Sequence, residues 1–344
     1  MQGAAVGELA IGGNFSHVIT PDHVSHAAKN FAIVAEATGT VLYAGNANSY
    51  VRAIASFGGT TYVGGDFTSF GGVSRSHAAA VSPSFGVTSW NPKPSGNVRG
   101  MSADSGGVYM GGDFSAVRAV SLSSGSTLWS KSSSGGSVHS VMVYDGALFV
   151  GGLFETYNGT TQHGLVKVAL SSGSLITSFN AHLRVDTGVG QYGAYDGEEI
   201  ISMWPGPSSS QLFIGSGGHA PAGKSSNEAI LISSSSGSRS WSTSTIGDCQ
   251  ALGAVGSTVV AGYHRNTANG SIPYPYFATQ LEDSNGKLTN WDPKITGNQG
   301  NADGGNNGVQ AIFSDSSTQT IYIAGAFTQY NGSSHKSLIA FTWS

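Results

Sequence analysis

The sequence predicts an all-β fold, namely a single β-propeller domain over residues 1–344 with seven blades of four antiparallel strands. A short apolar strand followed by small residues recurs seven times along the chain. Glycine supplies 51 of the 344 residues, which is about twice its usual share of roughly 7%. Hydrophobic residues reach 39% while charged residues supply only 10%, so the chain can bury a core and general disorder is excluded.

The repeated signature is an apolar triplet followed by small residues and often by an aromatic residue. Neighbouring copies start 40 to 64 residues apart, counted from the first small residue of each, and a four-stranded blade needs roughly 40–50 residues. Seven copies favour seven blades, with six or eight as open alternatives. The copies lie at 9–15, 61–67, 108–114, 148–154, 212–218, 259–264 and 321–327.

Each repeat divides into four strand-like segments, of which the signature is the second. The first carries a column of small residues, typical of a crowded inner strand: Ala53, Gly100, Ser140, Ser202, Ala251 and Ala311. The fourth ends in an aromatic residue, which we interpret as packing in or between blades: Trp90, Trp129, Phe179, Trp241 and Trp291. The pattern predicts that the chain begins at a second strand and ends at a third, so we expect N- and C-terminal strands together to close the ring.

The repeat resembles the delta-60 family of bacterial β-propeller repeats. The likeness is strongest at 148–180, good at 61–92 and 286–293, and weak over 182–230. This resemblance implies a propeller of the kind seen in bacterial surface or secreted proteins and in tail proteins of phages that infect actinobacteria. It implies no defined catalytic residues, so no catalytic role is carried over to this chain.

Two arginines stand fourteen residues before an aspartate, in the pairs Arg52–Asp66 and Arg99–Asp113. We expect each pair to lie directly opposite across the hairpin of the first two strands. The two positions change together, because Leu153, Tyr263 or Ala326 at the aspartate position accompanies His139, Gln250 or Gln310 at the arginine position. We interpret the pairs as structural ion pairs, and two ligand-binding arginines are the alternative.

Long insertions are predicted at one end of the blades. They lie between second and third strands at 16–29, 217–228 and 264–275, and between fourth and first strands at 181–197 and 293–308. In an antiparallel blade both kinds of connection lie on the same face. We expect this face to bind a ligand or partner, with ordinary loop variation as the alternative. The candidate residues are Tyr192, Tyr195, His219, His264, Arg265, Tyr274, Tyr276 and Asn298.

We interpret the remaining candidate residues as structural, and we expect no metal, no cofactor and no catalytic residues. The His23–His26 pair is the only closely spaced pair of histidines, and no helical His-Glu-x-x-His arrangement is present for a metal site. The acids in 196–199 and Asp303 are interpreted as solvated loop residues. The signature glycines lie within strands and are therefore packing positions. Cys249 is the single cysteine and excludes an internal disulfide, and the Asn-Gly pairs at Asn158, Asn269 and Asn331 are interpreted as turns.

The composition favours a protein that works outside the cell. A net charge of −4 gives no basic surface for nucleic acid, and no apolar stretch is long enough for membrane insertion. Few Lys and Glu residues suit an extracellular protein, yet the N-terminus shows no signal peptide. We therefore predict a phage tail-tip or minor tail protein that contacts the host surface.

A secreted, lectin-like bacterial adhesion propeller is the alternative function, and a propeller enzyme acting on glycans is a weaker one. The partners we expect are a host cell-surface glycan or protein and other tail proteins. A homo-oligomer is expected by analogy with tail tips.

Overall fold

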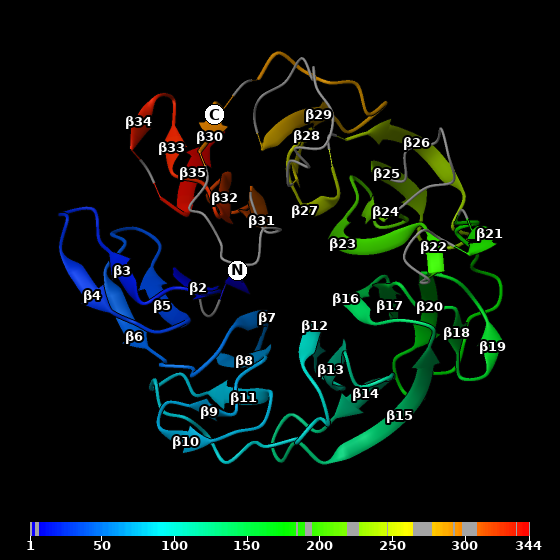
Figure 1. Cartoon of the computed structure of the whole chain (residues 1–344), viewed down its shortest axis with the longest axis horizontal. Coiled ribbons are helices and arrows are strands. Elements are labelled where there is room, and N and C mark those ends of the chain that lie inside the picture. The colour runs from blue at the N-terminus through cyan, green and yellow to red at the C-terminus, as the bar shows by residue number, and fades with distance from the viewer. Residues whose placement is uncertain are drawn as a thin grey trace. The chain divides into compact units, whose positions relative to one another are not determined.

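Every regular element of the described chain is a β-strand (Figure 1). The computed structural model describes residues 2–3, 7–183, 185–189, 195–218, 227–245, 247–263, 277–291, 293–297, 308–334 and 336–343, with backbone alone at 2–3, 185–189 and 195–197. The chain divides into two compact units: the first comprises 1–150, 154–162 and 167–175, and the second comprises 151–153, 163–166 and 176–344.

The N-terminal unit contains three complete antiparallel sheets in which the strands follow chain order. The first joins β1 (Gln2–Gly3), β2 (Glu8–Gly12), β5 (Phe31–Ala35) and β6 (Val41–Ala44). The second joins β7 (Val51–Phe57), β8 (Thr60–Gly65) and β11 (Ala78–Val81). The third begins with β12 (Val98–Asp104), β13 (Gly107–Gly112), β14 (Ala116–Val120) and β15 (Thr127–Ser134). The division between the units passes through the next sheet, of β16 (Val138–Tyr144), β17 (Ala147–Gly152) and β20 (Leu165–Ala169).

The C-terminal unit repeats the same arrangement. One sheet joins β23 (Glu199–Pro205), β24 (Gln211–Gly217), β25 (Glu228–Ser233) and β26 (Arg239–Ser244). The next joins β27 (Cys249–Val255), β28 (Thr258–Tyr263) and β29 (Ala278–Glu282). The last joins β31 (Val309–Asp315), β32 (Thr320–Gly325) and β35 (Leu338–Thr342).

Short hairpins occupy several connections between second and third strands. They are β3 (His17–Ile19) with β4 (Ser25–Ala27), β9 (Ser69–Phe70) with β10 (Val73–Ser74), β18 (Thr156–Tyr157) with β19 (Thr160–Thr161), and β33 (Gln329–Tyr330) with β34 (Ser333–Ser334). β18 also pairs with the end of β15, and β33 pairs with β30 (Ile295–Thr296). These pairings tie a hairpin to the end of the preceding repeat.

The Asn-Gly pairs form the predicted turns where the structure describes them. Asn158 and Gly159 have φ of 49° and 76°, and Asn331 and Gly332 have 48° and 76°. Positive φ at both central residues is the requirement of a type I′ hairpin turn, which Asn-Gly meets at low cost. Both turns are therefore confirmed, and Asn269 lies outside the described residues.

The seven signatures lie in seven separate sheets, each as the second strand. The expected regular fourth strand is present only as β6, β15 and β26 within the described residues. Elsewhere the fourth segment makes single bridges: Val81 with Val87, Val168 with Leu175, and Leu281 with Leu288. Proline two residues after Trp90 and Trp291 limits strand extension there, because proline donates no ladder hydrogen bond.

The expected sheet shared by strands from both chain ends is not found among the described residues. β1 pairs with β2, so the first sheet takes all four strands from residues 2–44. The last sheet takes its three strands from 309–342. The prediction missed β1 because two residues, Gln2 and Gly3, give no readable strand pattern.

The first glycine of the signature packs against the next repeat, which confirms that it is a packing position. A Cβ atom built on Gly111 would lie 2.7 Å from Cβ of Val138, the first residue of β16. Gly64 meets Val98 and Gly262 meets Val309 in the same way. Only a residue without a side chain lets the successive sheets approach this closely.

The aromatic column also links neighbouring repeats. The indole Nε1 of Trp90 donates to the carbonyl of Ser121 at 2.8 Å, that of Trp129 to Leu170 at 2.7 Å, and that of Trp241 to Asp283 at 2.8 Å. Trp90 is 1% exposed. Each ring thus combines apolar packing with a satisfied polar atom, which the buried Trp90 in particular requires.

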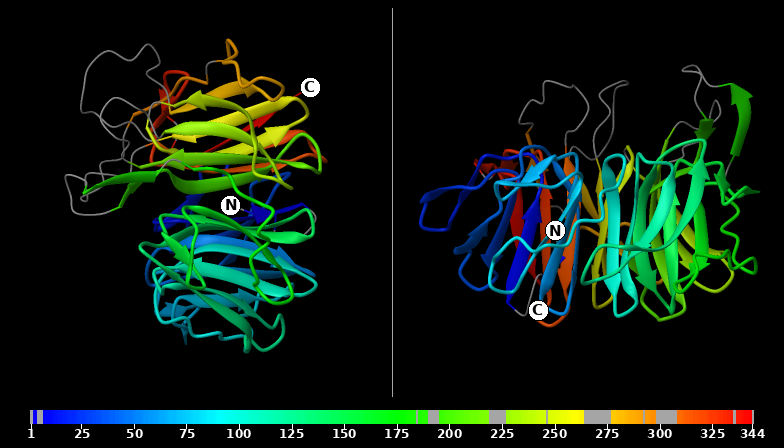
Figure 2. Two further views of the ribbon diagram at one scale, coloured as in Figure 1. Left: turned by 90° about the vertical axis from the view of Figure 1, so that its right-hand side faces the viewer. Right: turned by 90° about the horizontal axis from the view of Figure 1, so that it is seen from below.

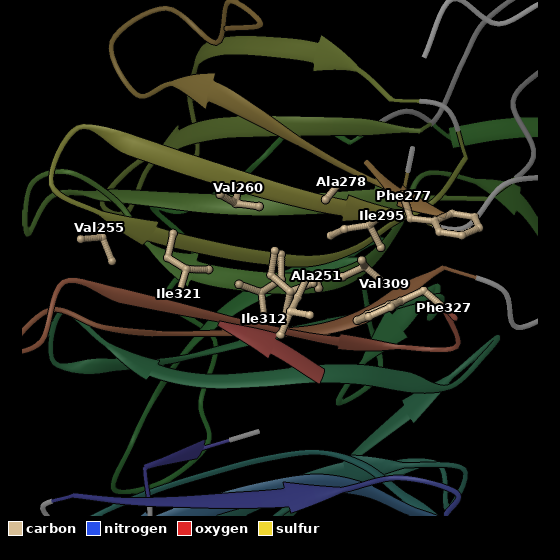
Figure 3. Close-up of a cluster of buried hydrophobic side chains, with 12 residues drawn as sticks. Ala251, Val255, Val260, Phe277, Ala278, Ile295, Val309, Ile312, Ile321 and Phe327 are labelled. Carbon is tan, nitrogen blue, oxygen red and sulfur yellow. The ribbon is translucent and has the colours of Figure 1, made fainter. Parts of the chain in front are cut away.

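One core cluster of the C-terminal unit lies between the sheets of β27–β29 and β31–β35 (Figure 3). Its side chains are aliphatic along the strands and aromatic at one end, where Phe277 and Phe327 lie. Both glycine contacts and apolar side chains therefore hold adjacent sheets together.

Candidate binding site

The residues predicted to bind a ligand lie almost entirely outside the described residues. Only the backbone of Tyr195 is described, in β22 (Tyr195–Gly197), which pairs with β21 (Val185–Val189). The insertion at 181–197 therefore contains a two-stranded hairpin. The others lie outside the described part of the chain: Tyr192, His219, His264, Arg265, Tyr274, Tyr276 and Asn298.

The two arginine–aspartate pairs are present as ion pairs at the end of their sheets. Arg52 donates from Nε and Nη2 to the two carboxylate oxygens of Asp66, each at 2.6 Å. Arg99 Nε donates to Asp113 at 2.5 Å. The arginine side chains are 32% and 33% exposed, so the pairs are partly solvated and each stabilises the fold only modestly.

The prediction that each pair lies directly opposite in the ladder is wrong, because a β-bulge occupies the arginine position. Val51 pairs with Gly65 and Ala53 with Gly64, which leaves Arg52 without a partner residue. The same irregularity skips Arg99, Gln250 and Gln310 in their hairpins. A bulge re-aims the extra side chain, here toward the aspartate beyond the end of the second strand.

The same register corrects one predicted equivalence. Tyr263 pairs with Cys249 as Gly65 pairs with Val51. Tyr263 therefore matches Gly65, and the position of Asp66 falls on His264, outside the described residues. The signature at 259–264 has Tyr263 in place of the second glycine, so the sequence alone does not show this one-residue offset.

Asp113 makes the stability of its ion pair with Arg99 depend on pH. Burial alone would raise the pKa of its carboxyl group, but hydrogen bonds from Arg99, Ser137 and Asn97 outweigh it and hold the pKa below the ordinary 3.8. A lowered folded-state pKa means that the stabilisation is complete above the unfolded-state value and is lost as the pH falls through the folded-state value.

We therefore expect Asp113→Asn to lower the melting temperature at neutral pH and to match the wild type at roughly pH 2. Melting curves recorded across the acid range check this. In an Arg99→Met background the same substitution should change the curves less, because the main partner is gone. A difference in melting temperature between wild type and Asp113→Asn that stays the same at every pH would contradict a lowered pKa of Asp113.

A hollow of about 400 Å³ lies in the N-terminal unit, where β2 ends and β5 and β7 begin. In this unit, this end of the strands carries the connections between second and third and between fourth and first strands. Figure 2 shows the strands of the unit in two further views. Its volume is within the range of roughly 300–1,000 Å³ found for small-molecule sites. The hollow is lined by Asn14, Phe15, Ser16, Lys29, Asn30, Asn48, Ser49 and Tyr50.

Two asparagines fix the walls of this hollow. Asn30 is 4% exposed, accepts a hydrogen bond from the Phe15 amide at 3.1 Å and donates to the Ala47 carbonyl at 2.9 Å. Asn48 accepts from the amides of Thr68 and Ser69 at 2.8 and 3.0 Å. Both side chains are occupied within the protein, so they hold the loops in place rather than meet a ligand.

Other lining groups remain accessible. Asn14 Nδ2 donates to the Tyr50 hydroxyl at 2.9 Å, which orients the ring and leaves the hydroxyl proton to donate elsewhere. The guanidinium carbon of Arg52 lies 5.1 Å from the centre of the Tyr50 ring, as a cation–π contact. The ring is thus held by Asn14 at its tip and by Arg52 near its face.

The sequence contains a signal for this hollow. Asn14 occupies, in the first signature, the position that Asp66 and Asp113 occupy later, and Tyr50 stands two residues before Arg52. The repeat alignment therefore places Asn14 and Tyr50 at the same end as the ion pairs. The predicted insertion at 16–29 contributes Ser16 and Lys29 to the lining.

A buried charge cluster in the C-terminal unit corrects the interpretation of the acids in 196–199. Glu198 is 1% exposed, and Arg239 binds it at 2.6 Å and Glu228 at 3.0 Å. Glu198 is therefore no solvated loop residue. The side chain of Arg239, on β26, reaches both carboxylates. Glu198 and Arg239 are 41 residues apart in the sequence, so no local pattern predicts their contact.

Three further observations concern chemistry. No group of three His, Cys, Asp or Glu side chains among the described residues is placed to hold a metal ion. The Cys249 thiol is fully buried, and burial raises its pKa to about 12, so it is a poor nucleophile. No helix in the described chain is long and apolar enough to cross a membrane.

Comparison with solved structures identifies the fold. The WD40 β-propeller domain of Doa1 is similar with a TM-score of 0.58 and 11% identity, over 94% of this chain and 87% of that chain. The computationally designed Ika8 protein is similar with a TM-score of 0.52 and 14% identity, over 98% and 97%. At such identities the likeness concerns the fold alone. The chain therefore has an all-β, β-propeller fold.

Sequence comparison adds no relative. No family model matches the chain, and no curated protein matches it.

Proposed function

We propose that this chain is a non-catalytic binding protein that recognises a carbohydrate at a cell surface through the hollow of its N-terminal unit. The observation that carries the proposal is the composition of that hollow: a Tyr50 ring held in place beside amide, hydroxyl and ammonium groups. A sugar presents an apolar ring face, which an aromatic ring can cover, and hydroxyls, which amides and hydroxyls can bond. Six of the eight lining residues are Asn, Ser or Lys, so the lining suits a polar ligand rather than an apolar one.

We also propose that the chain is one domain of seven blades closed into a ring. Seven signatures in seven separate sheets support this number, as does the contact of the first signature glycine with the next repeat in six of the seven signatures. The ring would present the insertions as one face, with Tyr192, Tyr274 and Tyr276 as further contacts for a large ligand. Counting the blades in an experimental structure tests the proposal.

The proposed place of the protein is the tail tip of a phage, where it would bind a host-surface glycan or protein and neighbouring tail proteins, as a homo-oligomer. The resemblance to delta-60 repeats and the extracellular type of composition support this location. A secreted adhesion protein would use the same site. Detection of the chain in purified virions by mass spectrometry separates the two.

We expect Tyr50→Ala to lower the affinity for a bound glycan by roughly tenfold or more, because a central aromatic anchor carries much of a binding energy. Binding is measured first on a glycan array and on whole cells, and then by calorimetry with the saccharide found.

Phe57→Ala is the matched control, since Phe57 is an aromatic residue 38% exposed at the opposite end of β7. A variant with Tyr192, Tyr195, Tyr274 and Tyr276 changed to alanine tests the insertions separately. Unchanged affinity of a folded Tyr50→Ala protein would remove the hollow from the site, and no binding by the wild type would overturn the carbohydrate function.

A further inference from the structure

We propose that the hollow selects a negatively charged saccharide, one whose ring carries a carboxylate or a phosphate, and that Lys29 is the group that binds this anion. The inference rests on the proposed carbohydrate function of the same site and names its ligand class.

The charge of the lining is the first support. Lys29 is the one charged residue among the eight that line the hollow, and none of them is acidic. The whole chain carries a net charge of −4, so this local excess of positive charge runs against the overall balance. An exposed lysine at a site whose lining contains no carboxylate favours an anionic ligand.

The state of Lys29 is the second support. Its backbone is fixed, because its amide donates to Asn46 Oδ1 at 3.2 Å and its carbonyl accepts from the Ala47 amide at 2.9 Å. Its side chain is exposed and has no hydrogen bond or ion pair to any other described residue. A positioned residue with an uncommitted ammonium can meet a ligand without first breaking an internal bond.

The acid beside the site is already neutralised. Both carboxylate oxygens of Asp66 accept hydrogen bonds from Arg52, the residue that packs on the Tyr50 ring. Asp66 therefore does not offset the charge of Lys29.

The polar groups of the hollow complete the argument, because they favour an acceptor-rich ligand. The Tyr50 hydroxyl accepts from Asn14, so its own proton is available to a ligand oxygen. With the Lys29 ammonium, the hollow offers two donors that suit a carboxylate or phosphate beside a sugar ring. Lys29 would thus bind the anionic group of the ligand, and Tyr50 would contact its sugar ring.

Calorimetry with three probes tests the inference: an oligosaccharide that ends in a sugar carboxylate, its uncharged methyl ester, and the matching sugar phosphate. We expect Lys29→Met to weaken binding of the preferred anionic probe by roughly tenfold and to leave the methyl ester unchanged. Lys287→Met, at an exposed lysine of the C-terminal unit, should change neither. Added salt should weaken the binding of the anionic probes and leave the binding of the methyl ester unchanged.

The outcomes separate this inference from the function on which it rests. Wild-type protein that binds the methyl ester as well as both anions, or Lys29→Met protein that keeps the preference, overturns the anion site and leaves carbohydrate binding intact. Inorganic phosphate bound as tightly as the sugar phosphate also overturns it, since the sugar would then contribute nothing. Absence of binding to every saccharide overturns both proposals.

Discussion

Gly112→Ala is expected to lower the free energy of unfolding by about 3 kcal/mol or more, at or beyond the upper end of overpacking costs. A Cβ at Gly112 would overlap the carbonyl oxygen of Asn97. That carbonyl cannot move freely, because it accepts the Asp113 amide at 2.9 Å. The bulge at Arg99 thus brings the backbone of the first strand against the second glycine of the signature. Urea unfolding of the two proteins measures the difference.

Gly86→Ala is the matched control in the same unit. Its Cβ would meet only Ser82 Oγ at 3.5 Å, an ordinary contact, and its backbone has no positive φ. We expect little change there. Two other repeats have Ser216 and Tyr263 at the position of Gly112. A neutral Gly112→Ala would show that the bulged backbone adapts in the third sheet as it does in those two, and would contradict the steric account.

Arg239→Met is expected to lower the free energy of unfolding by about 3–5 kcal/mol, the usual cost of removing one partner from a buried ion pair. Arg239 is shared by two carboxylates whose side chains are 0% and 7% exposed. Without the guanidinium, both charges stay buried with their main partner lost. Thermal and urea unfolding give the size of the effect.

Two further variants make this result specific. Arg118→Met removes an arginine that bonds Thr127 and has no ion-pair partner among the described residues, so it should be nearly neutral. Adding Glu198→Gln to Arg239→Met removes one of the stranded charges and should recover part of the loss. Equal destabilisation by Arg118→Met and Arg239→Met would show that the cluster contributes nothing beyond side-chain packing.

The repeated elements could be predicted because their local pattern repeats. An apolar triplet with small residues identified the second strand of all seven sheets, since each copy meets the same neighbours. The fourteen-residue spacing identified the partners of Arg52 and Arg99. The bulge could not be predicted, because one extra residue in a strand leaves the spacing of the partners unchanged.

The binding hollow and the buried cluster depend on contacts between distant segments. Lys29 and Tyr50 line one hollow across 21 residues of chain, and Glu198 meets Arg239 across 41. Neither contact follows from local periodicity. The acids in 196–199 look like loop residues in the sequence, and only the tertiary packing shows that Glu198 is buried.

Hydrogen–deuterium exchange with and without the bound saccharide tests the central claim most directly, because it locates the binding site on the folded chain. The account predicts slower exchange in peptides that cover residues 13–16, 29–30 and 46–50, and none of this protection in Tyr50→Ala protein. Protection confined to other segments of a protein that binds the saccharide would contradict a site at the hollow of the N-terminal unit.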